Sequence, residues 1–241
     1  REILGAASND VLRGVAASVA AVLGKSLAGG VDMQALAAPV AQYRDLFAEH
    51  ESALVDAVAR PAANALAEQS AAKPRALGDA DASIQSFRAL FPQQSELLDE
   101  RLLSRVVDSL RVSATKEADM PGAYVDSVAA FVRWLPTSGS ALERVVAPVF
   151  EDGIERSTRT SPNDLQALEK RLTAFRQMFP ARAQRLLERS SVIVVGALQN
   201  KYQGDAMSLP ALRDDVANFA RVFPRQTETL RARLAPTVAE S

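Results

Sequence analysis

The six residues Phe87-Arg88-Ala89-Leu90-Phe91-Pro92 decide the fold predicted for this chain, because the stretch recurs. Matching stretches begin at Phe131, Phe175 and Phe219, and a weaker copy without the proline begins at Tyr43. These five aromatic anchors are separated by 44 residues at every step. A fixed period of this length is typical of proteins built from stacked copies of one supersecondary unit.

Apolar residues stand at constant distances from each anchor. An aliphatic residue lies three positions before it, and large apolar residues lie three and four positions after it. The residues four positions after the anchors are Phe47, Phe91, Leu135, Phe179 and Phe223. Positions −3, 0, +3 and +4 fall on one stripe of an α-helix. The pattern therefore predicts that the first helix of each repeat has one buried face.

The residue five positions after the anchor is proline in four copies and Ala48 in the first. Proline cannot continue a helix without losing a hydrogen bond, but it fits the first turn of a new helix. A leucine at position +11 then occurs in every copy: Leu54, Leu98, Leu142, Leu186 and Leu230. Each repeat is thus predicted to be a helical hairpin. Pro61 and Pro148 lie inside second helices, where we expect kinks.

The links between hairpins, rich in Gly, Asp, Ser and Pro, define the predicted repeats. We expect repeats at 31–74, 75–118, 119–162 and 163–206, a partial repeat at 1–30 and a C-terminal repeat at 207–241, all in one solenoid domain. A single hairpin with apolar stripes on both helices cannot bury them, whereas stacked hairpins share a continuous core. The fold class predicted is all-α, an α-solenoid (superhelix) of stacked helical hairpins.

This architecture resembles the general class of α-solenoids that includes HEAT, armadillo and tetratricopeptide-like repeats. The likeness is one of hairpin stacking alone. The period differs from the roughly 34 residues of tetratricopeptide repeats, and their Trp/Gly/Tyr pattern is missing. What the resemblance implies is an extended surface suited to binding.

The first five residues match residues 44–48 in type and order, at a spacing of 43. We therefore expect the sequence to be a fragment of a longer chain whose preceding residue is another aromatic anchor. The apolar stripe of residues 9–27 is then predicted to be partly uncovered, because natural solenoid ends carry a polar capping face. Self-association through this N-terminal end is an expected consequence.

Composition excludes several classes of protein. The net charge is −1, which argues against a dedicated nucleic-acid binder, because such proteins carry a basic surplus. The absence of cysteine excludes disulfides and thiolate metal sites, and it leaves the compartment open. No apolar run approaches the roughly 20 residues of a membrane-spanning helix. Arginine outnumbers lysine 23 to 5, which we interpret as the bias of a GC-rich bacterial genome.

Three short stretches of the sequence partly match known catalytic or phosphate-binding motifs, but none of these motifs is complete. Residues 24–26 read Gly-Lys-Ser, but a phosphate-binding loop needs a glycine where Val19 stands. The Ser-x-x-Lys spacing at 70–73 and 113–116 lacks the other motifs of serine acyl-transfer enzymes. His50 is the only histidine and is expected to be exposed at the start of a second helix, so multi-histidine metal sites are excluded. We expect no enzyme activity, no cofactor and no metal.

An arginine follows the anchor by one or two positions in each repeat, which makes these residues the candidate partner-binding site. They are Arg44, Arg88, Arg133, Arg176 and Arg221. Repeated at constant pitch, they would form a ladder for an acidic peptide or a phosphate backbone. The alternative is a solvated helix edge with local ion pairs. Positions +1 and +2 differ by roughly 100° around a helix, so the five residues do not share one line.

The sequence therefore favours a non-catalytic α-helical repeat scaffold that mediates protein–protein interaction. Its partner would be another protein or a peptide. Two alternatives stay open at this point. One is a nucleic-acid-binding solenoid that uses one arginine per repeat, which the charge balance disfavours. The other is a regulatory or recruitment segment of a larger enzyme.

Overall fold

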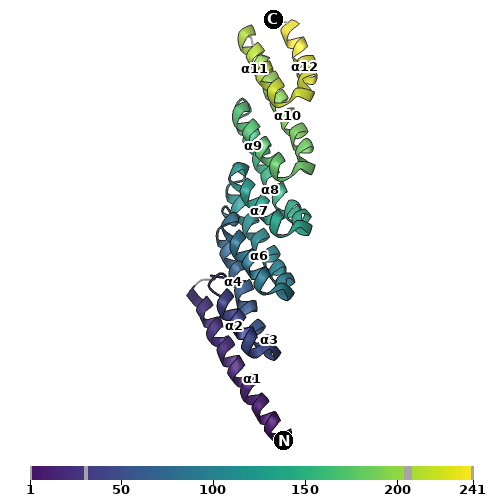
Figure 1. Cartoon of the computed structure of the whole chain (residues 1–241). Helices are drawn as coiled ribbons and strands as arrows, with labels where there is room; N and C mark the ends of the chain where they lie inside the picture. Colours follow the sequence, from purple (N-terminus) through teal and green to yellow (C-terminus); the bar gives the residue numbers. More distant parts are fainter. Residues whose placement is uncertain (1, 30–31, 204–207, 240–241) are drawn as a thin grey trace. The chain divides into compact units, whose positions relative to one another are not determined.

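The chain is helical in the parts that the structure describes (Figure 1). The structure is a computed structural model, and it describes residues 2–29, 32–203 and 208–239. The α-helices are α1 (Glu2–Lys25), α2 (Ala37–Phe47), α3 (Glu51–Leu54), α4 (Arg60–Ala72), α5 (Asp81–Leu90), α6 (Ser95–Lys116), α7 (Val125–Trp134), α8 (Gly139–Thr160), α9 (Leu165–Met178), α10 (Pro180–Tyr202), α11 (Leu209–Val222) and α12 (Thr227–Ala239). No strand occurs in these described ranges, so the prediction of an all-α fold is confirmed.

Shorter helical turns join or extend these helices. The 3-10 turns are η1 (Ser26–Gly29), η2 (Ala48–His50), η4 (Leu77–Ala80), η5 (Pro92–Gln94), η6 (Pro121–Tyr124), η7 (Pro136–Ser138) and η8 (Pro224–Gln226), and η3 (Val55–Ala59) is a π turn. The π turn comes just before Pro61, whose ring nitrogen has no hydrogen to donate. The π turn therefore separates α3 from α4, whereas α8 continues through Pro148.

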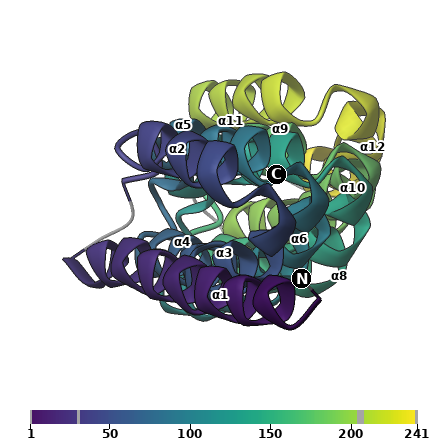
Figure 2. The same cartoon turned by 60° about the horizontal axis from the view of Figure 1, so that its bottom comes forward.

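Two compact units make up the chain. Unit 1 comprises Arg1–Leu110 with Asp126–Gly139, and unit 2 comprises Arg111–Val125 with Ser140–Ser241. Within unit 1, α1 packs against α2 and α3, and α4 packs against α5. Figure 2 shows α1 alongside α3. Within unit 2, α9 packs against α10 and α11 packs against α12 (Figure 1). The repeat boundaries given above stay a prediction.

The corners after the anchor motifs have nearly the same backbone geometry. At Phe91, Leu135, Phe179 and Phe223, φ lies between −126° and −135° and ψ between 62° and 69°. At each corner the backbone N–H donates to the carbonyl of the anchor four residues earlier, over 2.7–2.9 Å. A residue before proline is pushed out of the helical region, and the proline then begins the next helix. The predicted helix breaks are therefore present.

The anchors and the leucines at position +11, which the apolar pattern predicts to be buried, lie in the core. The five anchors are fully or almost fully buried, as are the five leucines at position +11. In four repeats the anchor ring also contacts an aromatic ring at +4, with centroids 4.9–5.4 Å apart. Burial of one such Phe is worth about 3–5 kcal/mol relative to Ala. Each buried anchor therefore contributes strongly to the stability of the core around it.

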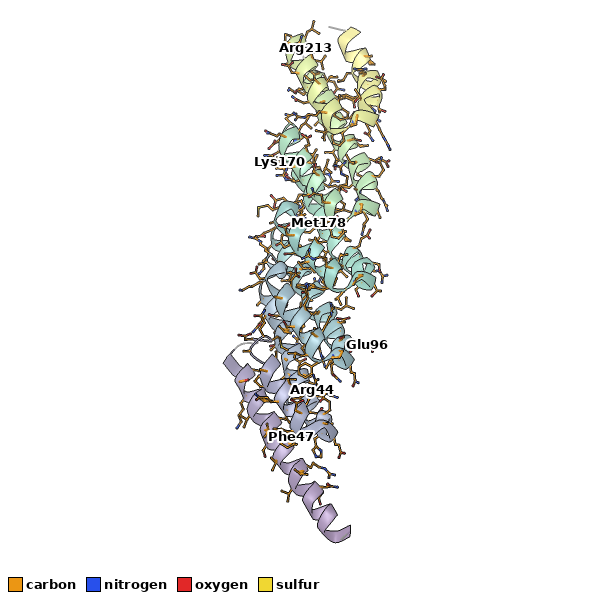
Figure 3. All side chains as sticks on the ribbon, viewed as in Figure 1. Arg44, Phe47, Glu96, Lys170, Met178 and Arg213 are labelled. Atoms are coloured by element: carbon orange, nitrogen blue, oxygen red, sulfur yellow. The ribbon has the colours of Figure 1, made fainter. Side chains whose placement is uncertain are left out.

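The N-terminal end of unit 1 exposes apolar side chains, as the sequence predicts. Large apolar side chains of α1 are exposed at Val11, Leu12, Val15, Val19 and Val22. On α2, Leu46 is 73% exposed, although Trp134, Met178 and Val222, which stand three positions after later anchors, are buried. Phe47, also on α2 and labelled in Figure 3, is half-buried.

Two glycines allow close approach between segments. In unit 1, a Cβ added to Gly24 of α1 would overlap the carbonyl oxygen of Ala57 in the π turn. In unit 2, a Cβ added to Gly153 of α8 would overlap the carbonyl group and the Cβ of Ala118, which follows α6. Because glycine has no side chain, the two backbones can pack directly against each other at both positions.

Candidate functional site

Arg44 lies on α2 and is held inside unit 1 (Figure 3). Its Nε donates to both carboxylate oxygens of Glu51 over 3.1 and 3.2 Å, and its Nη2 donates to Oε1 over 2.7 Å. Its guanidinium carbon also lies 5.5 Å from the ring centre of Phe91, at the next corner. Arg44 thus joins α2 to α3, and Glu51 balances its charge.

Arg88 and Arg133 are also engaged within unit 1. The Nη2 of Arg88 donates to Oδ1 of Asp99 over 2.7 Å and to the carbonyl of Trp134 over 2.7 Å, at the end of α7. The Nη2 of Arg133 donates to Oδ2 of Asp81 over 2.7 Å, and the indole Nε1 of Trp134 donates to Oδ1 of the same Asp81. These three arginines therefore stabilise contacts between helices.

The two remaining candidates, Arg176 and Arg221, come together in unit 2. Arg221 on α11 pairs through Nε with Oε2 of Glu169 on α9, over 3.3 Å. Arg176 on α9 is exposed and forms no ion pair or hydrogen bond with the part of the chain that the structure describes. Of the five predicted site residues, Arg176 and Arg221 line the same hollow.

That hollow, named here the arginine groove, lies between the hairpins α9–α10 and α11–α12 and has a volume of about 410 Å³. It is lined by Glu169, Leu172, Thr173, Arg176, Gln184, Leu187, Arg221, Val222, Pro224, Arg225 and Gln226. Three arginines and one glutamate give the lining a net charge of +2. Arg225, at the corner turn, is exposed and, like Arg176, unpaired within the described residues. The groove therefore presents two uncompensated guanidinium groups.

A second hollow of about 200 Å³, named here the valine niche, lies between α10 and α12. It is lined by Glu188, Ser191, Val192, Val195, Gln226, Thr229 and Arg233. Gln226 borders both hollows, so the niche adjoins the arginine groove at the corner turn η8. Val192 is 64% exposed although it is aliphatic.

Arg225 and Gln226 were not among the sites predicted from the sequence. They occupy positions +6 and +7 after the anchor Phe219, immediately beyond the corner proline. The arginines predicted from the sequence stand at positions +1 and +2 after their anchors. The sequence does distinguish Arg225, because arginine follows the corner proline only in the last copy of the motif. The residue after this proline belongs to the first turn of a new helix.

Other polar clusters of unit 2 are satisfied internally. The buried carboxylate of Glu151 binds Arg182 over 2.7 Å and Arg189 over 2.6 Å. Asp215 accepts hydrogen bonds from Lys201 over 2.6 Å and from Tyr202 over 2.7 Å. The bond to Asp215 raises the pKa of Lys201, and burial raises the pKa of Tyr202. Each cluster joins neighbouring helices of unit 2 through ion pairs or hydrogen bonds.

The residues of the incomplete catalytic motifs contribute to packing or hydrogen bonding, or are buried. Gly24 packs against Ala57, and the hydroxyl of Ser113 lies 2.7 Å from the hydroxyl of Tyr124. Ser70 is buried, and its hydroxyl has no hydrogen-bond partner among the described residues. His50 is half-buried and not exposed as expected, because its carbonyl accepts a hydrogen bond from Tyr43 and its turn packs against α2.

Three comparisons, with models of protein families, with curated proteins and with solved structures, find no match for this chain. Within the described residues, no helix is long and apolar enough to cross a membrane. In the same part of the chain, no three His, Cys, Asp or Glu side chains gather in a way that could hold a metal ion.

Proposed function

We propose that this chain is a non-catalytic α-helical repeat scaffold, a solenoid of hairpins on a 44-residue step, which binds another protein. The sequence period supports the repeat, and so does the recurrence of one corner geometry at four equivalent positions. Repeats of this kind offer extended surfaces to partner proteins.

Two equivalent ion pairs between successive repeats support the stacking. In unit 1, Arg133 binds Asp81, and in unit 2, Arg221 binds Glu169. In both pairs the acidic residue stands six positions before one anchor, and the arginine stands two positions after the next. Contacts that recur at the same repeat positions are expected when each repeat packs on its neighbour in the same way.

The observation that carries the binding function is the arginine groove. Arg176 and Arg225 are exposed and unpaired within the described chain, although the protein contains 29 acidic residues that could have neutralised them. Arginine is enriched at protein interfaces and in their energetic hot spots. A nucleic-acid ladder is less well supported, because Arg44, Arg88 and Arg133 already bind carboxylates of the chain.

The test is capture of partner proteins by the immobilised chain, followed by mass spectrometry. The variant Arg176→Glu/Arg225→Glu reverses both free charges of the groove. A matched control, Arg101→Glu/Arg105→Glu, makes the same charge change at two exposed arginines of α6. We expect the wild type and the control to retain the same proteins and the groove variant to lose them. Retention by all three chains would refute the proposal.

A further inference from the structure

We infer that the arginine groove accepts an extended acidic segment of the partner, and that one aliphatic side chain of this segment enters the valine niche. This inference rests on the protein-binding function proposed above. The positive charge of the arginine groove indicates an acidic ligand, and the apolar wall of the valine niche indicates an aliphatic residue within it.

The charge of the groove selects carboxylates. Glu169 is the one acidic residue among the described residues that line it, and Arg221 already binds that side chain over 3.3 Å. No carboxylate of the groove lining therefore neutralises Arg176 or Arg225, although the net charge of the whole chain is −1. A planar guanidinium can bind a carboxylate through two parallel N–H donors, which adds geometric specificity to attraction.

Amide groups at the junction suit a peptide backbone. Gln226 borders both hollows, and its side chain offers two donors and an acceptor at the point where a bound segment would pass from one to the other. Gln184, which also lines the groove, donates to Glu188 over 2.9 Å, and this bond fixes the orientation of its amide. An extended segment carries the complementary N–H and C=O groups along its length.

The valine niche suits one aliphatic side chain. Its volume of about 200 Å³ is below the roughly 300–1,000 Å³ of pockets that enclose whole small ligands, whereas the groove of about 410 Å³ falls inside that range. Val192 and Val195 form its apolar wall, and the hydroxyl of Ser191 is already bonded to the carbonyl of Glu188. Covering the exposed Val192 would remove apolar surface from water.

Carboxylates fit this surface better than phosphates do. Val192 and Val195 give the adjoining niche an apolar wall, which an aliphatic residue of an acidic segment can cover. The wall at Val192 also offers nothing to a nucleic-acid backbone. An acidic segment with one aliphatic residue uses both hollows, whereas a phosphate would use only the groove.

The probe is a fluorescein-labelled heptapeptide of glutamate with a central leucine, titrated with the whole chain by fluorescence anisotropy. Three related peptides replace all glutamates by glutamine, the central leucine by serine, or two glutamates by phosphoserine. We expect the glutamine peptide to bind at least about tenfold more weakly. The affinity for the glutamate peptide should fall as salt is added, because exposed charges are screened.

The protein variants separate the two hollows. Arg176→Glu/Arg225→Glu should weaken the glutamate peptide by at least about tenfold, Arg176→Gln/Arg225→Gln by less, and Arg101→Glu/Arg105→Glu should leave it unchanged. Val192→Asn should weaken the leucine peptide by about threefold and leave the serine peptide unaffected, because only the leucine reaches the niche. Circular dichroism spectra identical to that of the wild type would establish that the variants are folded.

Equal binding of the glutamate and glutamine peptides would overturn the inference, as would tighter binding of the phosphoserine peptide. Equal weakening of the leucine and serine peptides by Val192→Asn would remove the niche from the proposal. If the groove variant loses captured proteins while the glutamate peptide fails to bind, the scaffold function stands and the ligand chemistry is wrong. If capture does not depend on the groove, the scaffold function itself fails.

Discussion

Replacement of Gly153 by alanine is a sharp test of the packing in unit 2. Gly153 lies inside α8, and its missing side chain leaves room for the backbone of Ala118. A Cβ at this position would overlap the carbonyl group and the Cβ of Ala118. Because the opposing atoms belong to backbone and to a Cβ, no side-chain rotation can relieve the overlap. The two segments would have to move apart.

The expected size of the effect follows from two opposing terms. Alanine is favoured over glycine inside a helix by about 1 kcal/mol. Overpacking a close contact costs about 1–3 kcal/mol, and contact with backbone places this site at the upper end. Gly196 of α10 is the matched control, because a Cβ there would meet nothing within 4 Å. Gly196→Ala should therefore stabilise by up to about 1 kcal/mol, and Gly153→Ala should destabilise by about 2 kcal/mol.

Urea unfolding followed by circular dichroism measures the difference directly. The helix-propensity gain is common to both substitutions, so the separation of about 3 kcal/mol reports the overlap alone. With a slope of about 2 kcal/mol per molar urea, the two midpoints should differ by more than about 1 M. Midpoints that coincide, or a more stable Gly153→Ala chain, would show that α8 does not approach Ala118 as described.

Three further substitutions test the core and the exposed N-terminal face. Phe175→Ala should destabilise by about 3–5 kcal/mol while Arg176→Ala has almost no effect, because the first side chain is buried and the second is exposed; similar losses in urea would contradict the predicted register. Ser70→Ala should raise the free energy of unfolding by about 1 kcal/mol, since the buried hydroxyl has no partner among the described residues, and a lower melting temperature would count against this. Val11→Glu/Val22→Glu should reduce concentration-dependent self-association in sedimentation velocity, because both valines are more than half exposed; unchanged association would place the contact elsewhere.

Much of the local fold could be predicted because its causes are local. The Phe-Pro corners depend on the restricted backbone of proline and of the residue before it, and four of them recur with nearly equal dihedral angles. The buried stripe follows from helical periodicity. The π turn before Pro61 was not predicted, because a proline indicates a lost hydrogen bond and not the form in which the helix compensates.

The candidate site could be predicted only in part, because residues far away in the sequence determine whether an arginine forms an ion pair. Arg133 is neutralised by Asp81 and Arg221 is paired with Glu169, each 52 positions earlier in the chain. Helical angles alone placed the five arginines on different lines, but they did not identify which side chains are paired. An acidic residue six positions before an anchor, as at Asp81 and Glu169, indicates that the arginine two positions after the next anchor is paired. Arg225 escaped prediction because it follows the corner and not the anchor.

Deletion of one whole period is the most direct test of the repeat scaffold. Removal of residues 119–162 joins residue 118 to residue 163 and keeps every later anchor in register, whereas removal of residues 119–140 breaks the register by half a period. Thermal unfolding followed by circular dichroism should show one cooperative transition for the first deletion and a broad loss of helicity for the second. Equally broad unfolding of both chains would contradict the 44-residue stacked repeat.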